Sequence, residues 1–362
     1  MKQRDFFFDN AKFILMAFVV FGHLLNTYIH DSETIYALYK TIYSFHMPAF
    51  ILVSGFFAKG FYQKGYLGKI TKKLILPYII FQLIYTVYYY FLYDRSAITV
   101  DLLDPQWSLW FLISLFCWNI MLLGFSKLKP SVGIGFSLII ALLIGYIDNI
   151  SNYLSLSRTF VFFPMFLIGY HLSKEHLKKL FTPKVRLASL IVMLVIFIGF
   201  YLNTDINYKW LLGSKPYAEL EDATIVSMFK RLGFYGLSII SVFSFLSFIP
   251  RRQYFFTNWG KQTLYVYLLH GFFIRFFRES TIQEYFSNTE SFIMLAGLSL
   301  LITVLLSSEM IASMAQPVIE LKATKTKRFM TKTKDYIKQA FFFFKIRFLI
   351  RLSSRKDSTS IP

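Results

Sequence analysis

Three histidines lie within apolar stretches of this sequence, where an ionisable side chain is costly to bury. They are His23, His46 and His270. A neutral imidazole, with a pKa of about 6.5, can remove a proton from a hydroxyl group. We therefore take His23 and His46 as catalytic candidates, with His23 as the general base. The alternative for His23 is a structural histidine that is hydrogen-bonded to a neighbouring helix.

The two catalytic candidates belong to consecutive apolar runs that are joined by a short polar segment. We expect these runs to form antiparallel neighbouring helices, which would place His23 and His46 at a similar depth in the outer half of a membrane. Two histidines at one level can also bind a metal ion. The runs offer no nearby cysteine or carboxylate ligand, so we do not expect a metal site.

Two charged residues mark the inner end of the first apolar run. Asp9 and Lys12 are three residues apart, a spacing that allows an ion pair on one face of a helix. One interpretation is a helix-capping aspartate beside a lysine that extends to the membrane surface. The other is a cationic contact for a phosphorylated acyl donor.

Further residues are candidates for contacting an acceptor or for lining a polar cavity. They are Arg158, Arg231, His270, Glu309 and Trp110. Arg158 suits bidentate contact with a polar or anionic acceptor, or else anchors the helix at the interface. A buried Glu309 would need a partner, for which His270 is the candidate. Trp110 lies in the segment Trp107–Phe111, which we interpret mainly as an interfacial aromatic belt.

The composition indicates an all-α integral membrane protein. Of the 362 residues, 56% are hydrophobic and only 16% are charged, which excludes a disordered chain, a coiled coil and an ordinary cytosolic enzyme. The net charge of +19 would suggest nucleic acid in a soluble protein. Here the basic residues lie between apolar runs, so a lipid bilayer explains them and no nucleic-acid partner is expected.

The sequence predicts about ten transmembrane helices. They cover residues 11–29, 42–62, 74–93, 108–126, 131–147, 159–173, 187–203, 232–249, 263–278 and 291–315. With cytoplasmic termini, 30 of the 39 Lys and Arg fall on the inner side and five in outer loops. Residues 1–317 would form the transmembrane domain. Residues 318–362 would form a basic cytoplasmic tail with a candidate interfacial helix at 341–351.

Five separate stretches occur in an order that matches a known pattern. They are Phe8–Lys12 running to His23, Phe45–Pro48 running to Phe56, Trp107–Leu112, Phe162–Gly169 and Leu264–His270. With the predicted spans, the chain resembles the acyltransferase-3 family of membrane O-acyltransferases over about residues 5 to 315. It is most similar to the fucose-4-O-acetylase-like branch of that family.

The resemblance implies transfer of an acyl group, usually acetyl, from cytoplasmic acyl-CoA to a hydroxyl of an extracellular or lipid-linked envelope glycan. It implies His23 as the catalytic histidine, acetyl-CoA as a co-substrate with no tightly bound cofactor, and a bacterial plasma membrane. Many members carry arginine at the position of Lys12. The lysine in this sequence keeps the positive charge but lacks the bidentate fork of arginine.

Many relatives also carry an extracellular esterase-like domain, which this sequence does not show after the apolar runs. We therefore expect the chain to complete transfer alone or to pass the group to a separate extracellular transferase. The alternative function is a proton-coupled exporter of a polysaccharide or lipid-linked sugar, because ionisable residues at membrane depth also suit transport. No inverted repeat supports that alternative.

Overall fold

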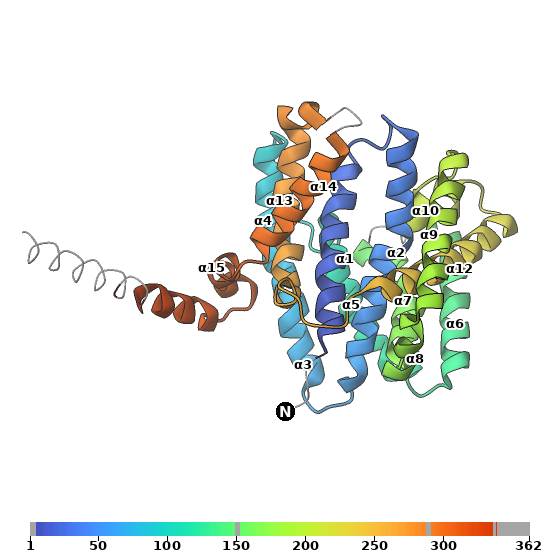
Figure 1. Ribbon diagram of the computed structural model, residues 1–362, viewed down its shortest axis with the longest axis horizontal. Coiled ribbons are helices and arrows are strands. Elements are labelled where there is room, and N and C mark those ends of the chain that lie inside the picture. Colours follow the sequence, from blue (N-terminus) through green and yellow to red (C-terminus); the bar gives the residue numbers. More distant parts are fainter. Residues whose placement is uncertain (1–4, 149–152, 287–290, 336–337, 339–362) are drawn as a thin grey trace, which may run out of the picture. The chain divides into compact units, whose positions relative to one another are not determined.

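The computed structural model describes residues 5–148, 153–286, 291–335 and 338 of the chain (Figure 1). These residues form helices and connecting segments without a strand, which confirms the predicted all-α class. The chain divides into two compact units, Met1–Ser307 and Ser308–Pro362. The predicted boundary at residue 317 falls inside helix α15 of the second unit. The predicted interfacial helix at 341–351 lies outside the described residues.

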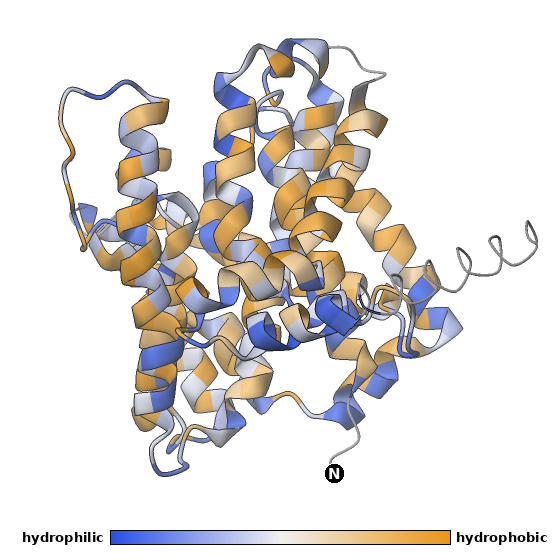
Figure 2. Ribbon diagram, turned by 90° about the vertical axis from the view of Figure 1, so that its left-hand side faces the viewer, coloured by the Kyte–Doolittle hydropathy of each residue, from blue (hydrophilic) through white to orange (hydrophobic). Residues whose placement is uncertain are grey.

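The first unit is built from long helices joined by short segments. The long helices are α1 (Phe6–Leu25), α2 (Glu33–Phe57), α4 (Leu76–Leu92), α5 (Trp110–Phe125), α6 (Pro130–Leu143), α7 (Leu156–His171), α9 (Pro183–Leu202), α12 (Ile225–Phe248), α13 (Thr263–Glu279) and α14 (Ser291–Leu306). Short helices are α3 (Tyr66–Ile70), α8 (Lys174–Lys178), α10 (Lys209–Leu212) and α11 (Tyr217–Leu220). Hydrophobic residues dominate the long helices (Figure 2).

Each predicted span has a helix in the structure. Within the described residues, seven helical segments are long and apolar enough to cross a membrane. The number becomes eight if α14 and α15 count as one span. Helix α6 is shorter, and α13 has only 17 residues. The count of ten therefore stays a prediction, as does the cytoplasmic location of the termini.

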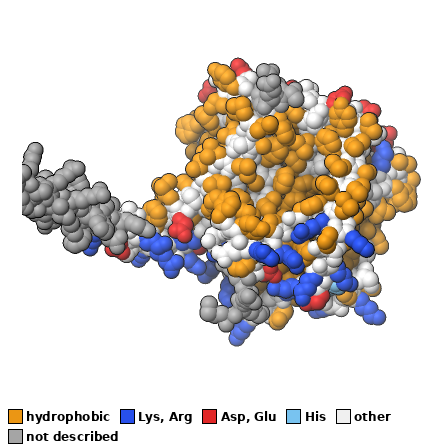
Figure 3. Space-filling view, in the orientation of Figure 1, with side chains coloured by type: hydrophobic (Ala, Val, Ile, Leu, Met, Phe, Trp, Pro, Cys, Tyr) orange, Lys and Arg blue, Asp and Glu red, His pale blue; other side chains and the backbone are white. Residues whose placement is uncertain are grey.

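The surface of the first unit has the character of a lipid-facing protein. Large apolar side chains cover much of the visible face, with Lys and Arg gathered toward its lower part and acidic residues both near its upper edge and among these cations (Figure 3). Helix α9 is mostly exposed, and its outward side chains include Leu187, Ile191 and Leu194. An exposed apolar surface of this kind fits contact with hydrocarbon.

Polar side chains fix the beginning of α1. Asp5 caps the helix by accepting a backbone N–H from its first turn, 3.2 Å away. One turn later, the buried Asn10 amide donates to the carbonyls of Pro250 and Arg252, each at 2.9 Å. The hydroxyl of Thr257 in turn donates to the Asn10 carbonyl oxygen at 2.7 Å. This network attaches the segment before α13 to the start of α1.

Helix α2 packs most extensively against α7, and the two cross at glycines. A Cβ atom at Gly55 would lie 2.0 Å from the carbonyl oxygen of Phe166, and one at Gly169 would lie 1.9 Å from that of Leu52. No side chain fits at either position without moving a backbone. Small residues at such a crossing let two helices approach closely inside a membrane.

We expect Gly169→Leu to prevent stable packing of α2 on α7. Overpacking usually lowers the free energy of unfolding by about 1–3 kcal/mol. Because the obstructing atom here is a backbone carbonyl oxygen that cannot rotate away, we expect a decrease at or above the top of that range. The measurement is the unfolding midpoint and the monodisperse fraction of the purified protein in detergent. Gly199→Leu is the matched control, because a Cβ at Gly199 has no atom within 4 Å. Equal stability of the two variants would contradict the tight crossing.

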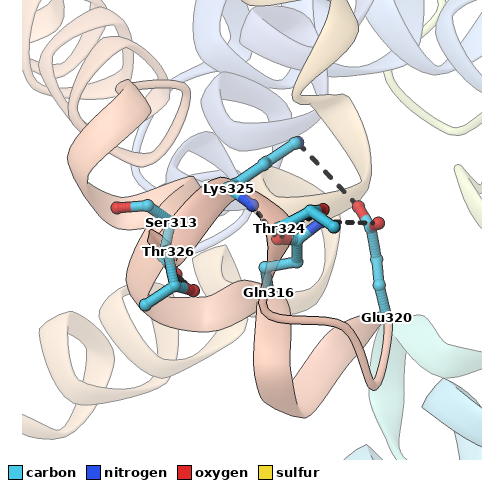
Figure 4. Close-up of polar contacts among 6 residues, drawn as sticks. All are labelled: Ser313, Gln316, Glu320, Thr324, Lys325 and Thr326. Atoms are coloured by element: carbon cyan, nitrogen blue, oxygen red, sulfur yellow. Dashed lines mark hydrogen bonds and ion pairs between the residues drawn. The ribbon is translucent and has the colours of Figure 1, made fainter. Parts of the chain in front are cut away.

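The second unit contains α15 (Glu309–Ile319) and a further helical stretch over residues 324–335. Gln316 joins them: its amide nitrogen lies 3.0 Å from a Glu320 carboxylate oxygen, and its carbonyl oxygen accepts the backbone N–H of Lys325 at 2.5 Å. Figure 4 shows these contacts among Ser313, Gln316, Glu320, Thr324, Lys325 and Thr326. They hold the turn between the two helical stretches.

Glu309 is an exposed residue, and the prediction that it is buried is wrong. Its side chain is 79% exposed and lies 3.8 Å from the Lys332 ammonium group. Ser308 caps a new helix at this point, so Glu309 belongs to the first turn of α15, where a negative charge is favourable. Residues 291–315 were predicted as one continuous span because hydropathy does not show the helix break at Ser308.

Candidate active site

A cavity of about 910 Å³ runs beside α1 in the first unit. Four residues of α1 and its C-cap residue line it at spacings of three and four, which places them on one face of the helix. They are Lys12, Met16, Val19, His23 and Asn26. The fourteen-residue separation between the first and the last corresponds to about 21 Å along the helix axis. This length compares with about 30 Å for the hydrocarbon core of a bilayer.

His23 faces this cavity and is held by aromatic residues from three other elements. Its Nδ1 atom lies 3.2 Å from the hydroxyl oxygen of Tyr43 on α2. The centroid of its ring is 4.5 Å from that of Trp107 and 5.5 Å from that of His270 on α13. In the tautomer in which Nδ1–H donates to Tyr43, the Nε2 atom keeps a lone pair that can accept a proton.

His46 and His270 also line the cavity and are almost completely buried, with exposed fractions of 1% and 0%. Nδ1 of each lies near a carbonyl one turn earlier, Ile42 at 2.8 Å and Val266 at 3.0 Å. A carbonyl only accepts, so Nδ1 carries the proton and Nε2 holds the lone pair of the neutral ring. The Nε2 atom of His270 has no hydrogen-bond partner among the described residues.

Tyr43 links the two histidines that the sequence singled out. Its hydroxyl contacts His23, and its ring packs edge-on against His46 with 4.4 Å between centroids. The prediction that α1 and α2 are neighbours is confirmed by their direct packing. Tyr43 was not predicted as a site residue. Its position three residues before His46, on the same face of a helix, is the signal that identifies it.

Arginine side chains lie at the end of the cavity near His23. Arg158 and Trp110 both line the cavity, and the guanidinium carbon lies 5.0 Å from the tryptophan ring centroid. On α13, Arg278 donates to the backbone carbonyl of His23 at 2.6 Å. The Arg275 guanidinium lies 4.9 Å from the ring centroid of Trp107.

The other end of the cavity is lined by Lys12, Lys69 and Lys73. The ammonium group of Lys12 lies 2.9 Å from the Asp9 carboxylate, as the spacing predicted. Lys69 belongs to α3, and Lys73 belongs to a π-helical turn at Thr71–Ile75 that continues into α4. The widened turn is a feature often found at functional sites.

Trp107 is part of the site, although its segment has the composition of an interfacial aromatic belt. It lies beside His23, His270 and Arg275, at the start of a 3-10 turn over Trp107–Leu109. Its backbone φ is +35°, in the left-handed region that a bulky residue rarely adopts. Strain of this kind persists where the surrounding packing imposes it, and it concentrates at functional sites.

Arg231 does not line the large cavity. It donates to the Lys215 carbonyl at 2.9 Å and lies 4.3 Å from the Tyr217 ring centroid, beside a separate pocket of about 30 Å³. The prediction placed it at the start of a span, but α12 begins earlier, at Ile225, which turns Arg231 toward α11. Its neighbour Lys230 pairs with Glu221.

Comparisons with known proteins extend this description. The chain matches a family model described as an acyltransferase domain over residues 5–308. It is similar to nodulation protein NolL of Mesorhizobium japonicum, with 32% identity over 30% of this chain and 33% of the relative. The same-named protein of Sinorhizobium fredii is 30% identical over 39% of this chain and 43% of the relative. Each match thus covers less than half the length of the curated relative. No solved structure matches it.

Proposed function

Because this chain belongs to the acyltransferase-3 family, we propose that it is a membrane O-acetyltransferase that moves an acetyl group from cytoplasmic acetyl-CoA to a hydroxyl of an extracellular or lipid-linked envelope glycan. We place it in a bacterial plasma membrane. The observation that supports this proposal is the single cavity that has a lysine cluster at one end and three histidines toward the other. Such a cavity can bring a phosphorylated donor and a hydroxyl acceptor together from opposite sides.

The lysine end suits the nucleotide part of acetyl-CoA. Its phosphate groups are strong acceptors, and Lys12, Lys69 and Lys73 supply positive charge where the cavity begins. The stretch of cavity beyond them is lined by apolar residues such as Met16 and Val19, which suits the thin pantetheine arm. Bound in this way, the arm would carry the thioester toward His23.

The histidine end suits removal of a proton from the acceptor hydroxyl. His23 accepts that proton as the hydroxyl oxygen attacks the thioester carbonyl, and the C–S bond breaks when the tetrahedral intermediate collapses. The proton then passes to the departing CoA sulfur. Tyr43 orients the His23 ring, and when its hydroxyl oxygen accepts from Nδ1–H it leaves Nε2 able to take the proton. The chain completes this reaction itself or passes the acetyl group to a separate extracellular transferase.

The direct test uses membranes that contain the protein, labelled acetyl-CoA and total envelope glycans. We expect alkali-labile label in the glycan fraction, absent from membranes without the protein. Longer acyl-CoA donors test the identity of the acyl group. Movement of unmodified glycan across the membrane, with no ester formed from any donor, would overturn the proposal in favour of export.

A further inference from the structure

The charges that line the cavity are all of one sign. No aspartate or glutamate belongs to its lining among the described residues, whereas cations occur at both ends. Lys12, Lys69 and Lys73 form one group, and Arg158 and Arg278 form the other. The first group is accounted for by the phosphates of the proposed donor. The phosphates do not account for the second group. We call Arg158, Arg278 and the neighbouring Arg275 the outer arginines.

The outer arginines have few partners of their own. None of the salt bridges among the described residues includes Arg158, Arg275 or Arg278. Arg275 contacts the Tyr93 hydroxyl at 3.2 Å and Arg278 contacts a backbone carbonyl, but the Nε atoms of both are buried without a hydrogen-bond partner. Asp104 interacts electrostatically with Arg158 without forming an ion pair. Unpaired guanidinium groups in such a place are costly, which indicates that an anion joins them in the working complex.

The transferase reaction alone does not supply enough negative charge for this group. Acyl transfer develops one transient oxyanion, and one guanidinium or a pair of neutral donors is sufficient to stabilise it. The phosphates of the donor belong to the lysine end, where Lys12 lies about 16 Å along α1 from His23, the residue that Arg278 contacts. A fixed negative charge on the acceptor accounts for the remaining arginines.

Resting on the proposed function, we infer that the acceptor is an anionic glycan whose carboxylate or phosphate group binds to Arg278 and Arg158 beside the hydroxyl that is acylated. The arginine fork matches both groups in a bidentate manner. Other residues at the same end suit the sugar itself. Asn26 lines the cavity there, as do Tyr39 and Tyr208, whose rings lie 5.4 Å apart.

Binding can be tested without catalysis on the purified full chain in detergent. The probes are methyl β-glucuronide, glucose 1-phosphate and the neutral methyl β-glucoside at equal concentration. We expect the anionic sugars to raise the unfolding midpoint and the neutral sugar to leave it unchanged. The larger of the two anionic shifts distinguishes a carboxylate ligand from a phosphate ligand. Equal shifts with all three probes, or a shift with the neutral sugar alone, would overturn the inference.

Variants assign the effect to the outer arginines. We expect Arg278→Gln to remove the shift caused by the anionic sugars and Arg278→Lys to retain part of it. Arg95→Gln, which changes an exposed arginine outside the cavity, should keep the full shift. If Arg278→Gln does not fold, Arg158→Gln replaces it. A full shift in folded variants of both arginines would overturn the inference.

Labelled transfer to the same sugars separates this inference from the proposed function. We expect the native protein to favour the anionic sugars over the neutral one by about tenfold or more in kcat/KM, and Arg278→Gln to lower that ratio about tenfold, mainly through KM. Transfer with no preference for charge would leave the transferase in place and overturn the anionic acceptor. If no acceptor receives label, including total envelope glycans, the proposed function fails, and the binding experiment alone then decides whether an anion is bound.

Discussion

Replacing His23 with alanine is expected to lower acetyl transfer by about 10²–10⁴-fold, the contribution that general-base catalysis usually makes. The ring lies on the cavity-facing side of α1, with its Nδ1 atom 3.2 Å from the Tyr43 hydroxyl. Alanine removes the only ring on α1 that faces the cavity there, and it leaves the contact of Arg278 with the backbone carbonyl possible. The measurement is the initial rate at which label from acetyl-CoA enters alkali-labile ester.

His30→Ala is the matched control, because His30 is exposed and lies outside the cavity. Both variants should purify as folded protein. The free energy of unfolding of each should lie within about 1 kcal/mol of the native value. A His23→Ala protein that keeps more than a tenth of the native rate would contradict the assignment. The base would then be sought at His46 or His270, whose Nε2 atoms hold lone pairs in the same cavity.

Removing the lysine cluster is expected to raise the KM for acetyl-CoA by about ten- to a hundredfold. The change is the triple substitution Lys12→Gln, Lys69→Gln and Lys73→Gln. Each lysine offers a charge-assisted contact to phosphate, but Lys69 and Lys73 are exposed, so screening by solvent and salt reduces their individual effects. The KM of the native protein should also rise with ionic strength, and that of the triple variant should rise less.

The control for this experiment removes the same charge from the same predicted side of the membrane. Lys127→Gln, Lys129→Gln and Lys184→Gln change exposed lysines that do not line the cavity. We expect this control to keep the native KM, and we expect kcat at saturating donor to be similar in all three proteins. An equal rise in KM for both triple variants would indicate a diffuse electrostatic effect and not a donor site.

Most of the helical framework could be predicted from the sequence, because long apolar runs are a strong signal. Each predicted run contains a long helix, although the last run is divided between α14 and α15. The expected packing of the first two runs is also present, and Tyr43 contacts both His23 and His46. The ion pair of Asp9 with Lys12 followed from helical spacing in the same way. These are local relations that a repeat of 3.6 residues determines.

The remaining site residues depend on how distant segments meet, which hydropathy does not encode. Trp107 has the composition of an interfacial residue, and only the packing of the segment before α5 against α1 and α13 places it beside His23. Lys69 and Lys73 looked like ordinary loop cations, because the continuity of α3, the π-helical turn and α4 was not visible in the sequence. Arg278 is assigned to the site by its contact with the His23 carbonyl, a relation between α1 and α13.

The most direct test of the central claim separates donor and acceptor by a sealed membrane. The full chain is reconstituted into vesicles, its orientation is established by protease access, and labelled acetyl-CoA and envelope glycan are placed on opposite sides. We expect ester to form on the glycan only when acetyl-CoA faces the Lys12 end of the cavity and the glycan faces the Asn26 end. Transfer that occurs only when donor and acceptor share one side of the membrane would contradict the proposal that this cavity carries an acetyl group across it.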